Sequence, residues 1–475
     1  MLRVIKDLFS SNPACVLVNN LLSPKFLINH GVLQGSKLGP ILFNVFINDL
    51  LNELDKTGSG ATIGAIHIAA LGFADDIVLI SDDPQKLQDL LNLCQSWSIK
   101  NEMTFNTSKC KVMIFNGPAK NSIFTLCGKA LEIVNSHKYL GVILSSKYVT
   151  NLFRSHFTSI LERARIKVAL IRRHGFHDDG LRLKTAINMY KLIIRPLLEY
   201  CAQSLSYGRY SHPAHLDAPT DFAKELEQFQ TQTLKTLINC PRSTSPAVVR
   251  LFCGVEPLTC RLEILKLRYF WRTLHCPKDT TPNRILTYRK KKFLDFNKGF
   301  AHEAFNICCK YNLMHLWHGK AASLKPLHEI KKVIISKNLQ NDLDASRSKS
   351  CSFISLFLTN AFSYQKKYHL VEPFLQPNCF DLPNGRKRFI KALLHPCSYL
   401  EECVFCREQY KDKLKHLLTA CPLTSGKRKE LLLKLSLYNF PRQQFPLEKD
   451  KLLNAALTSR IWRKCFTKFL IDTDF

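Results

Sequence analysis

Two adjacent carboxylates, Asp75 and Asp76, interrupt a strongly apolar segment of this 475-residue chain. The segment is AALGFADDIVLIS, and the apolar, β-branched runs on either side of the acids are typical of two short strands. The acids therefore fall at or next to a tight turn. Two carboxylates at the tip of a buried strand pair are destabilising unless a cation neutralises them, and a divalent metal is the usual solution. The pattern predicts a metal site at this turn.

A second set of metal-binding side chains lies near the end of the sequence. Cys403, Cys406, His416 and Cys421 have the ligand types and number of a closed structural zinc site. Pro422 disfavours a helical conformation at the preceding cysteine, so the chain can turn back towards the metal there. The alternative is coincidence in a chain with 18 cysteines, several of which would be packing residues. The compact spacing and the surrounding basic residues favour zinc.

The composition is that of a basic chain that folds. Hydrophobic residues make up 46% and aromatic residues 10%, and 68 Lys and Arg against 38 Asp and Glu give a formal net charge of +30. Because the basic residues are spread along the whole chain, we expect extended basic faces, for which nucleic acid is the natural partner. The alternative is a basic surface that serves solubility alone.

The sequence favours a nuclear or cytoplasmic location. Met1–Asp7 lacks the apolar core of a secretory signal, and the sequence contains no run of about 18 uncharged apolar residues, so we expect no membrane span. The many cysteines would then be reduced thiols, with metal binding for a subset.

Up to about residue 145, the sequence predicts alternating strands and helices. A loop dense in glycine, residues 31–40, leads into a helix at 41–54, and Asp83 caps a helix that Pro84 begins. The remaining predicted elements are a short amphipathic helix near the N-terminus, strands at 14–18 and 111–115, and a hairpin at 137–142.

From residue 150 the apolar residues recur every three or four positions, which predicts a helical region that is basic on its outer faces. The expected helices cover residues 151–174, 180–204, 222–239 and 257–275. The expected loops cover residues 207–219, 277–282 and 341–350.

The order of these pieces resembles the reverse transcriptases of non-LTR (LINE-like) retrotransposons. GVLQGSKLGPILFNVFINDL is similar to the segment of that family that positions template and nucleotide. FADD resembles its catalytic turn, TFNTSKCKVMIF the segment that follows, and KYLGV the primer grip. The similarity continues through LEYCAQSLSYG and LINCPRSTSPAVVRLFCGVEPLTCRLEILKLRYFWR, which are typical of the thumb and downstream region. The order and spacing of these motifs together carry the resemblance.

The resemblance implies an α+β fold that contains a partial polymerase palm, an antiparallel sheet with helices. The implied organisation is a partial palm and fingers region at 1–145, a helical thumb at 146–300, a helical basic connector at 301–395 and a zinc-binding region at 396–475. The family carries a Cys-Cys-His-Cys cluster near its C-terminus, and HLLTACP resembles the second half of that cluster. The implied partners are an RNA template and a DNA primer or target, and the oligomeric state stays open.

The resemblance also assigns roles to individual residues. Nucleotide addition uses two divalent ions about 3.5–4 Å apart, and Asp75 would bind Mg²⁺ while Asp76 supports the site. Lys109 is a candidate general acid for the pyrophosphate leaving group, with a surface lysine as the alternative. The residues that would shape the pocket for the incoming nucleotide, the template base and the primer end are Gln34, Gly35, Pro40 and Phe73.

One part of the implied metal site has no counterpart in the sequence. The family has an earlier strand, ahead of the glycine-rich loop, that supplies an indispensable Asp. In residues 1–30 the only acid is Asp7, which lies in the helix-like run RVIKDLF. We therefore expect the chain to begin just downstream of half of its active site, and not to polymerise DNA by itself.

Two alternatives remain. The chain would be a domesticated RNA- or DNA-binding protein without catalysis, or an unrelated phosphotransferase with paired acids. The second would need another carboxylate cluster, and none of the acids at 77–145 lies in a comparable strand: Asp82, Asp83, Asp89, Glu102 and Glu132.

Overall fold

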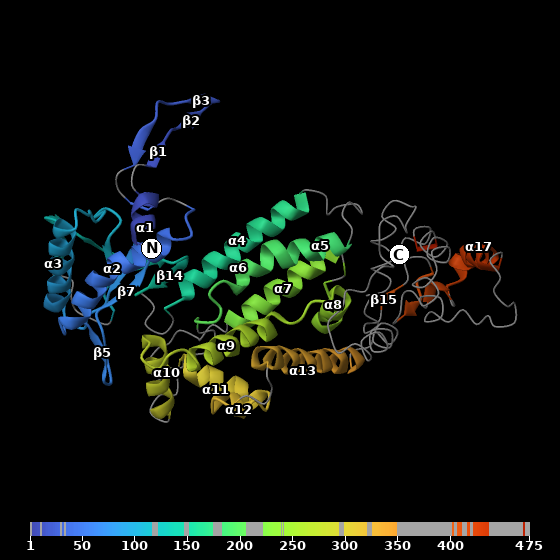
Figure 1. Ribbon diagram of the computed structural model, residues 1–475. Coiled ribbons are helices and arrows are strands. Elements are labelled where there is room, and N and C mark those ends of the chain that lie inside the picture. Colours follow the sequence, from blue (N-terminus) through green and yellow to red (C-terminus); the bar gives the residue numbers. More distant parts are fainter. Residues whose placement is uncertain are drawn as a thin grey trace. The chain divides into compact units, whose positions relative to one another are not determined.

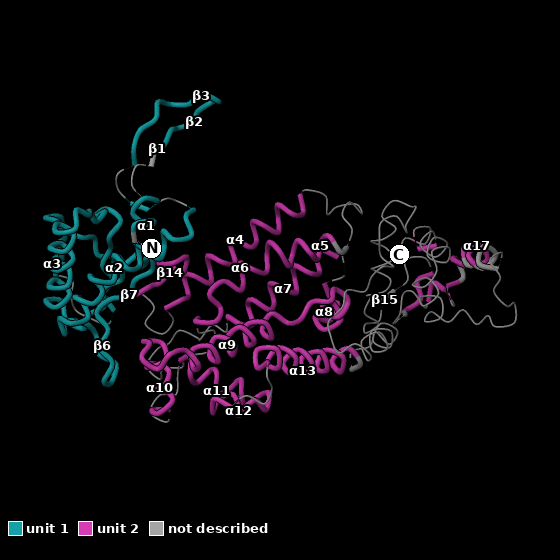
Figure 2. The backbone as a smooth tube through the Cα atoms, in the orientation of Figure 1, with its two compact units in different colours: residues 1–137 teal, residues 138–475 magenta. Residues whose placement is uncertain are grey.

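The computed structural model divides the chain into two compact units, residues 1–137 and 138–475 (Figures 1 and 2), and each is described by itself. The structure describes residues 2–9, 12–28, 31–32, 35–115, 122–146, 152–173, 183–205, 222–238, 240, 242–293, 299–320, 325–348, 401–402, 406–410, 416–418, 421–436 and 469–470. The first boundary falls after His137 rather than at 145, and the four-part organisation stays a prediction. Among the described helices, none combines the length and the hydropathy that a membrane span requires.

Two long helices form the frame of the first unit. Helix α2 spans Gly39–Lys56 and α3 spans Pro84–Lys100, so both predicted helices are confirmed. Pro40 lies in the first turn of α2, where its missing N–H leaves no hydrogen bond unmade. The carboxylate of Asp83 accepts a hydrogen bond from the backbone N–H of Lys86 at 3.0 Å and caps α3 as predicted. The short N-terminal helix is also confirmed, as α1 at Leu2–Phe9.

The core of the first unit lies between α2, α3 and the strands. The rings of Phe46 and Trp97 meet edge to face, with centroids 5.3 Å apart. Each fully buried leucine contributes about 1.5–3 kcal/mol through its removal from water. The buried side chains of this core are Ile47, Leu50, Leu54, Ala69, Leu90, Leu91, Cys94, Trp97, Val112, Phe124, Leu126 and Leu131.

The strands of the first unit form two-stranded ladders, so the expected palm sheet is a set of separate strand pairs in the described residues. The antiparallel pairs are β1 (Asn12–Ala14) with β4 (Phe26–Ile28), β2 (Leu17–Val18) with β3 (Leu21–Leu22), β5 (Ala61–Ile63) with β6 (Ile66–Ile68), β7 (Ala70–Phe73) with β8 (Asp76–Leu79), and β10 (Thr125–Leu126) with β11 (Lys129–Ala130). Strand β9 (Lys111–Val112) pairs in parallel with β12 (Glu132–Ile133). The expected mixture of helices and strands is confirmed, but the predicted strand at 14–18 is split and the one at 111–115 is shorter.

The second unit is mainly helical, and its four predicted helical segments are confirmed; a hairpin whose first strand crosses the boundary at His137 precedes them. The hairpin is β13 (Ser136–Tyr139) with β14 (Val142–Ser145). The helices are α4 (Arg154–Arg173), α5 (Leu183–Met189), a π-helical turn (Tyr190–Ile194), α6 (Arg195–Glu199), α7 (Phe222–Ile238), α8 (Pro246–Cys253), α9 (Leu258–Leu274), α10 (Thr281–Lys291), α11 (Phe300–Lys310), α12 (Met314–Trp317) and α13 (Pro326–Ser348). Further along the chain lie β15 (Glu401–Glu402), β16 (Gln409–Tyr410), a 3₁₀ turn (Pro422–Thr424) and α17 (Ser425–Ser436).

Helix α9 is shared by two apolar clusters of the second unit. Leu258 and Leu262 belong to a cluster with α4 to α8, in which the Phe157 and Phe222 rings stack at 4.5 Å. Phe270 belongs to a second cluster with α10 to α13 and stacks on the Trp317 ring at 5.4 Å. Because α9 contributes to both clusters, the helices from α4 to α13 pack around a continuous core.

The predicted loop at 341–350 is wrong over most of its length, because α13 continues to Ser348. Asp342 is buried, and Arg250 of α8 donates to both of its carboxylate oxygens, with Nε to Oδ2 at 2.9 Å. The same guanidinium donates to Glu227 Oε1 at 2.9 Å. Tertiary packing and ion pairing thus outweigh the weak helix propensity of Asn, Asp and Ser. The predicted loop at 277–282 ends where α10 begins, and the one at 207–219 lies outside the described residues.

We expect Asp342→Ala to destabilise the protein by about 3–5 kcal/mol, because it removes a buried carboxylate that accepts from two nitrogens of the partly buried Arg250. Asp344→Ala is the matched control, since Asp344 is exposed on the same helix and its replacement costs within about 0.5 kcal/mol. Denaturant unfolding measures both. Equal unfolding midpoints for the two variants would contradict the assignment of the buried ion pair as a stabilising contact.

Candidate functional site

The predicted turn between two strands is confirmed. Strands β7 and β8 pair with Phe73 opposite Asp76, so Ala74 and Asp75 form the two-residue loop between them. Ala74 adopts a left-handed backbone with φ of 52°, as two-residue hairpin loops often require. The register places Asp75 in the loop and Asp76 at the first position of β8, so both acids lie at the tip of the hairpin.

Helix α2 supports this hairpin through a close approach at Gly72. A Cβ atom at Gly72 would lie 3.0 Å from Cδ1 of Leu51, which is tighter than an ordinary contact. Leu50, one residue earlier on α2, is fully buried. The absence of a side chain at Gly72 therefore lets the strand that precedes the acids lie directly on the helix.

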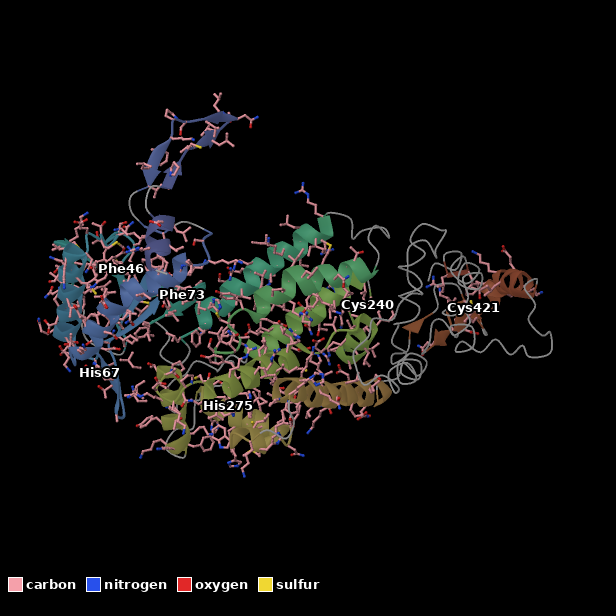
Figure 3. The ribbon with its side chains drawn as sticks, in the orientation of Figure 1. Phe46, His67, Phe73, Cys240, His275 and Cys421 are labelled. Carbon is pink, nitrogen blue, oxygen red and sulfur yellow. The ribbon has the colours of Figure 1, made fainter. Side chains whose placement is uncertain are left out.

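The expectation that the acids interrupt a buried strand pair is wrong at the tip. Asp75 and Asp76 are exposed, and Phe73 keeps 62% of its surface accessible (Figure 3). Within the described part of the chain, neither carboxylate forms a hydrogen bond or an ion pair through its side chain. The reason is that no described element covers this end of the hairpin, so water solvates both acids.

Three other residues assigned to the polymerase site are also exposed: Gly35, Pro40 and Lys109. Gly35 has a φ of 85°, and Pro40 lies at the start of α2. Lys109 follows a turn in which its N–H donates to Asn106 O at 3.0 Å. In the described residues no hydrogen bond or ion pair joins Lys109 to either acid. Gln34 lies outside the described residues, and the roles of all these residues stay predictions.

Asp75 and Asp76 do not by themselves fit a site for two divalent ions. Such a site places two cations about 3.5–4 Å apart, and Mg²⁺ demands near-octahedral oxygen coordination. Among the described residues, the only group of three or more metal-binding side chains that lie close enough together is elsewhere in the chain. The hairpin therefore offers part of a ligand set.

That other group consists of three of the four predicted zinc ligands. The ligand atoms of Cys406, His416 and Cys421 all lie within 4.8 Å of one another, and Cys406 Sγ is 3.2 Å from His416 Nε2. His416 and Cys421 are buried. The N–H of Cys421 donates to His416 O at 2.9 Å, as in the reversal of the chain that ends many helices. Cys403 lies outside the described residues.

The geometry of these three side chains suits a tetrahedral ion. Zinc binds cysteine sulfur at about 2.3 Å and histidine nitrogen at about 2.0–2.1 Å, so its ligand atoms lie within about 4 Å of each other. Two thiols and an imidazole come together here from separate positions along the chain, and the 3.2 Å between Cys406 Sγ and His416 Nε2 lies within this limit. Figure 3 marks the place of Cys421 beside α17.

The predicted hairpin at 137–142 is confirmed, and two side chains that sequence reasoning missed hold it. Leu140 and Gly141 both have positive φ, 45° and 80°, as in a type I′ turn. The backbone N–H of Ile143 donates to Nδ1 of His156 at 3.3 Å, and the hydroxyl of Tyr200 donates to Leu140 O at 2.8 Å. The buried apolar neighbours of His156 along α4 were the one sequence signal for its role.

Helix α4 carries a dense set of exposed cations. It contains one acid, Glu162, and an exposed apolar residue, Ile166, on the same outer side. Within the described residues these cations form no ion pair. They are Arg163, Arg165, Lys167, Arg172 and Arg173.

Comparison with known proteins shows what the chain is similar to. Residues 3–144 match the family model of reverse transcriptase (RNA-dependent DNA polymerase). The chain is 28% identical over 219 residues to the RNA-directed DNA polymerase from mobile element jockey of Drosophila funebris. The matched segment covers 45% of this chain and 23% of that protein. It is 38% identical over 300 residues to the Pol polyprotein from type-1 retrotransposable element R2 of Popillia japonica. That match covers 54% of this chain and 40% of that protein.

The chain is therefore related to the reverse transcriptases of non-LTR retrotransposons, and the resemblance drawn from its motifs is confirmed. It spans about a quarter of the length of the jockey relatives, 23% and 25%.

We expect His156 to make the protein less stable as the pH falls from about 6.5 to about 4. Burial, together with the nearby charges of Arg163 and Lys138, lowers the pKa of His156 to about 4. The unfolded chain binds this proton at about pH 6.5, so unfolding takes up a proton between the two values. The stability is complete above about pH 6.5, and the loss levels off below about pH 4.

The measurement is the free energy of unfolding against pH for the wild type and His156→Asn, whose amide oxygen can still accept from Ile143. The variant should show a flatter profile, and His275→Asn, at an exposed histidine just after α9 (labelled in Figure 3), is the control substitution. Parallel profiles for the wild type and His156→Asn would refute the assignment.

Proposed function

We propose that this chain is a reverse transcriptase-like, nucleic-acid-binding protein derived from a non-LTR retrotransposon, and that it does not extend DNA by itself. The observation that carries the proposal is the β7–β8 hairpin, which presents Asp75 and Asp76 in a motif that resembles the family's catalytic turn. A single hairpin supplies too few oxygen ligands for the two ions that phosphoryl transfer uses. In this role Asp75 would bind Mg²⁺ and Asp76 would support the metal site. Lys109 would donate a proton to the pyrophosphate leaving group.

The surroundings of the hairpin support a site that another strand completes. In the described part of the chain, β7 pairs with β8 alone, so its other edge is open to pairing. Apolar side chains of α2 and β7 are also exposed: Ile41 by 59%, Val45 by 68% and Leu71 by 43%. A strand that covered them could bring the further carboxylate that the metal site needs.

The basic face of α4 supports nucleic acid as the partner. Its 20 residues extend about 30 Å, which spans several phosphates along a nucleic-acid strand. The cations on this face have no ion-pair partners in the described residues, so they remain available to phosphates. We propose an RNA template and a DNA primer or target as the bound strands, in a nuclear or cytoplasmic setting.

A non-catalytic, domesticated RNA- or DNA-binding protein is the second candidate. The exposure of the acid pair favours it, because carboxylates in water need no metal to be tolerated. Both candidates use the basic face of α4, and they differ in whether added metal and a complementing strand can restore catalysis.

We also propose that Cys403, Cys406, His416 and Cys421 hold a structural zinc ion. The convergence of three of these side chains supports the site. Exposed Lys427 and Lys429 follow on α17, so the ion would fix a small basic fold that contacts RNA or DNA.

We expect the triple variant Arg163→Gln, Arg165→Gln, Lys167→Gln to bind an RNA–DNA duplex more weakly and with less dependence on salt. Each lost phosphate contact reduces the slope of log K against log salt by about 0.9. Fluorescence anisotropy over a salt series measures both quantities. The control, Lys325→Gln, Lys331→Gln, Lys332→Gln, removes as many charges from exposed positions at α13. Equal losses in the two triple variants, or no binding by the wild type, would contradict the proposed face.

We expect the purified chain to contain one zinc ion, and Cys406→Ser to lose it because a serine hydroxyl does not replace a thiolate ligand. Metal content by mass spectrometry gives the stoichiometry. Cys309→Ser, at an exposed cysteine outside the cluster, is the matched control and should keep the ion. Zinc retained by Cys406→Ser, or absent from the wild type, would reject the site.

A further inference from the structure

Residues 12–28 of the first unit form a ribbon of two strands. Strand β1 pairs with β4 and β2 pairs with β3 (Figure 1). Between these two ladders the N–H of Ser23 donates to Val16 O at 2.9 Å, so the ribbon is continuous. Within the described residues, none of its strands pairs with a third strand. Both long edges of the ribbon are therefore open to pairing.

The side chains of this ribbon are apolar and exposed on both faces. Opposite residues of an antiparallel pair share a face, so Val18 and Leu21 lie on one face and Leu17 and Leu22 on the other. None of these side chains belongs to the buried core of the first unit. Single exposed apolar residues are ordinary, but a continuous group of them marks an interaction surface. The group, with exposures between 37% and 76%, is Val16, Leu17, Val18, Leu21, Leu22, Phe26, Leu27 and Ile28.

The charge distribution of the chain favours a second copy as the partner of this ribbon. Residues 12–28 contain one charged side chain, Lys25, whereas the whole chain carries a net charge of +30. Two copies therefore repel each other over most of their surfaces, and the repulsion is weakest at this segment. A single cation also gives the ribbon little attraction for phosphates. Contact between two ribbons thus fits the charge better than contact with nucleic acid.

The free edge of β4 can pair with its own copy. Pro13 of β1 lies opposite Leu27 and has no N–H, so the hydrogen bonds of this ladder are expected at the residue pairs on either side. By the alternation of antiparallel strands, the N–H and C=O of Leu27 then point towards the free edge of β4. The free edge of β1 has Pro13 at the corresponding place, which cannot donate. Strand β4 is therefore the edge that can accept another strand.

We propose that the ribbon at 12–28 is a self-association surface, and that two copies of this chain pair antiparallel, β4 with β4, about a two-fold axis at Leu27. In this register Phe26 of each copy lies opposite Ile28 of the other, and pairs of aromatic and β-branched side chains stabilise neighbouring strands. An isolated two-stranded ribbon is at best marginally stable in water, and the pairing gives a sheet of four strands.

The assembly closes at two copies, because Pro13 leaves the outer edge of each β1 unsuited to a further strand. This inference goes beyond the proposed function. The dimer needs neither a metal ion nor nucleic acid, and it forms through the first unit alone.

The test is sedimentation velocity of the nuclease-treated full chain at increasing protein concentration. We expect a shift from one copy to two, and a tighter dimer at higher salt, because salt screens the repulsion between basic copies. Leu27→Lys places like charges opposite each other across the axis and should weaken the dimer by about a hundredfold. Leu192→Lys, the same change at an exposed leucine outside the ribbon, is the matched control and should leave the dimer unchanged.

Two charge-swapped variants test the register and separate loss of pairing from loss of folding. One chain carries Phe26→Glu and Ile28→Glu, and the other carries Phe26→Lys and Ile28→Lys. Each alone should remain a single copy, because like charges lie opposite each other. Their mixture should form a dimer, because every introduced carboxylate then lies opposite an introduced ammonium group.

Several results would overturn the proposed dimer. They are a wild type that remains a single copy at every concentration, equal weakening by Leu27→Lys and Leu192→Lys, and a charge-swapped mixture that does not associate. Growth to larger species without a stable dimer would also overturn it, because the paired ribbons close. None of these results bears on nucleic-acid binding, which the anisotropy measurement tests separately.

Discussion

Asp75 on a two-residue turn and Asp76 at the first position of β8 bring two negative charges to one hairpin tip, and how that charge is compensated determines what the first unit can do. The hairpin is not free to separate them, because β7 lies on α2 at Gly72 and the register sets Phe73 against Asp76. Water solvates both acids at the exposed tip. A divalent cation would compensate them better, but it needs oxygen ligands that this hairpin alone does not offer. The apolar exposure of Ile41 and Val45 follows from the same incompleteness, because nothing in the described residues covers that side of α2.

The second unit has to accommodate many cations in a folded chain. Some are taken into its interior and paired. Arg261 forms two hydrogen bonds to Glu199, at 2.7 and 3.0 Å, and Lys266 donates to the backbone oxygen of Leu205 at 2.7 Å. Others stay outside, as on α4. The cationic side chains behind the net charge of +30 thus fall into two groups. One group stabilises the helical core, and the other is exposed and available to bind phosphates.

Local patterns predicted the parts of the fold that short-range interactions determine. The Asp83 cap, the FADD turn and the KYLGV hairpin all depend on residues within a few positions of each other, and all three formed as expected. Long-range contacts could not be predicted in this way. The ion pair between Arg250 and Asp342 extends a helix through a segment whose composition favours a loop. Likewise, Tyr200 reaches Leu140 across 60 positions, and no local pattern indicates that contact.

The exposure of Asp75 and Asp76 was also beyond a local prediction, because burial depends on which elements cover a strand and not on the strand's own residues. The most direct measurement is therefore Mg²⁺-dependent primer extension on an RNA template by the purified 475-residue chain. The incomplete ligand set at the β7–β8 turn predicts no extension, even where the chain binds the primer–template. Extension by the wild type that Asp75→Ala abolishes would contradict it, and would mean that this chain holds a complete polymerase site.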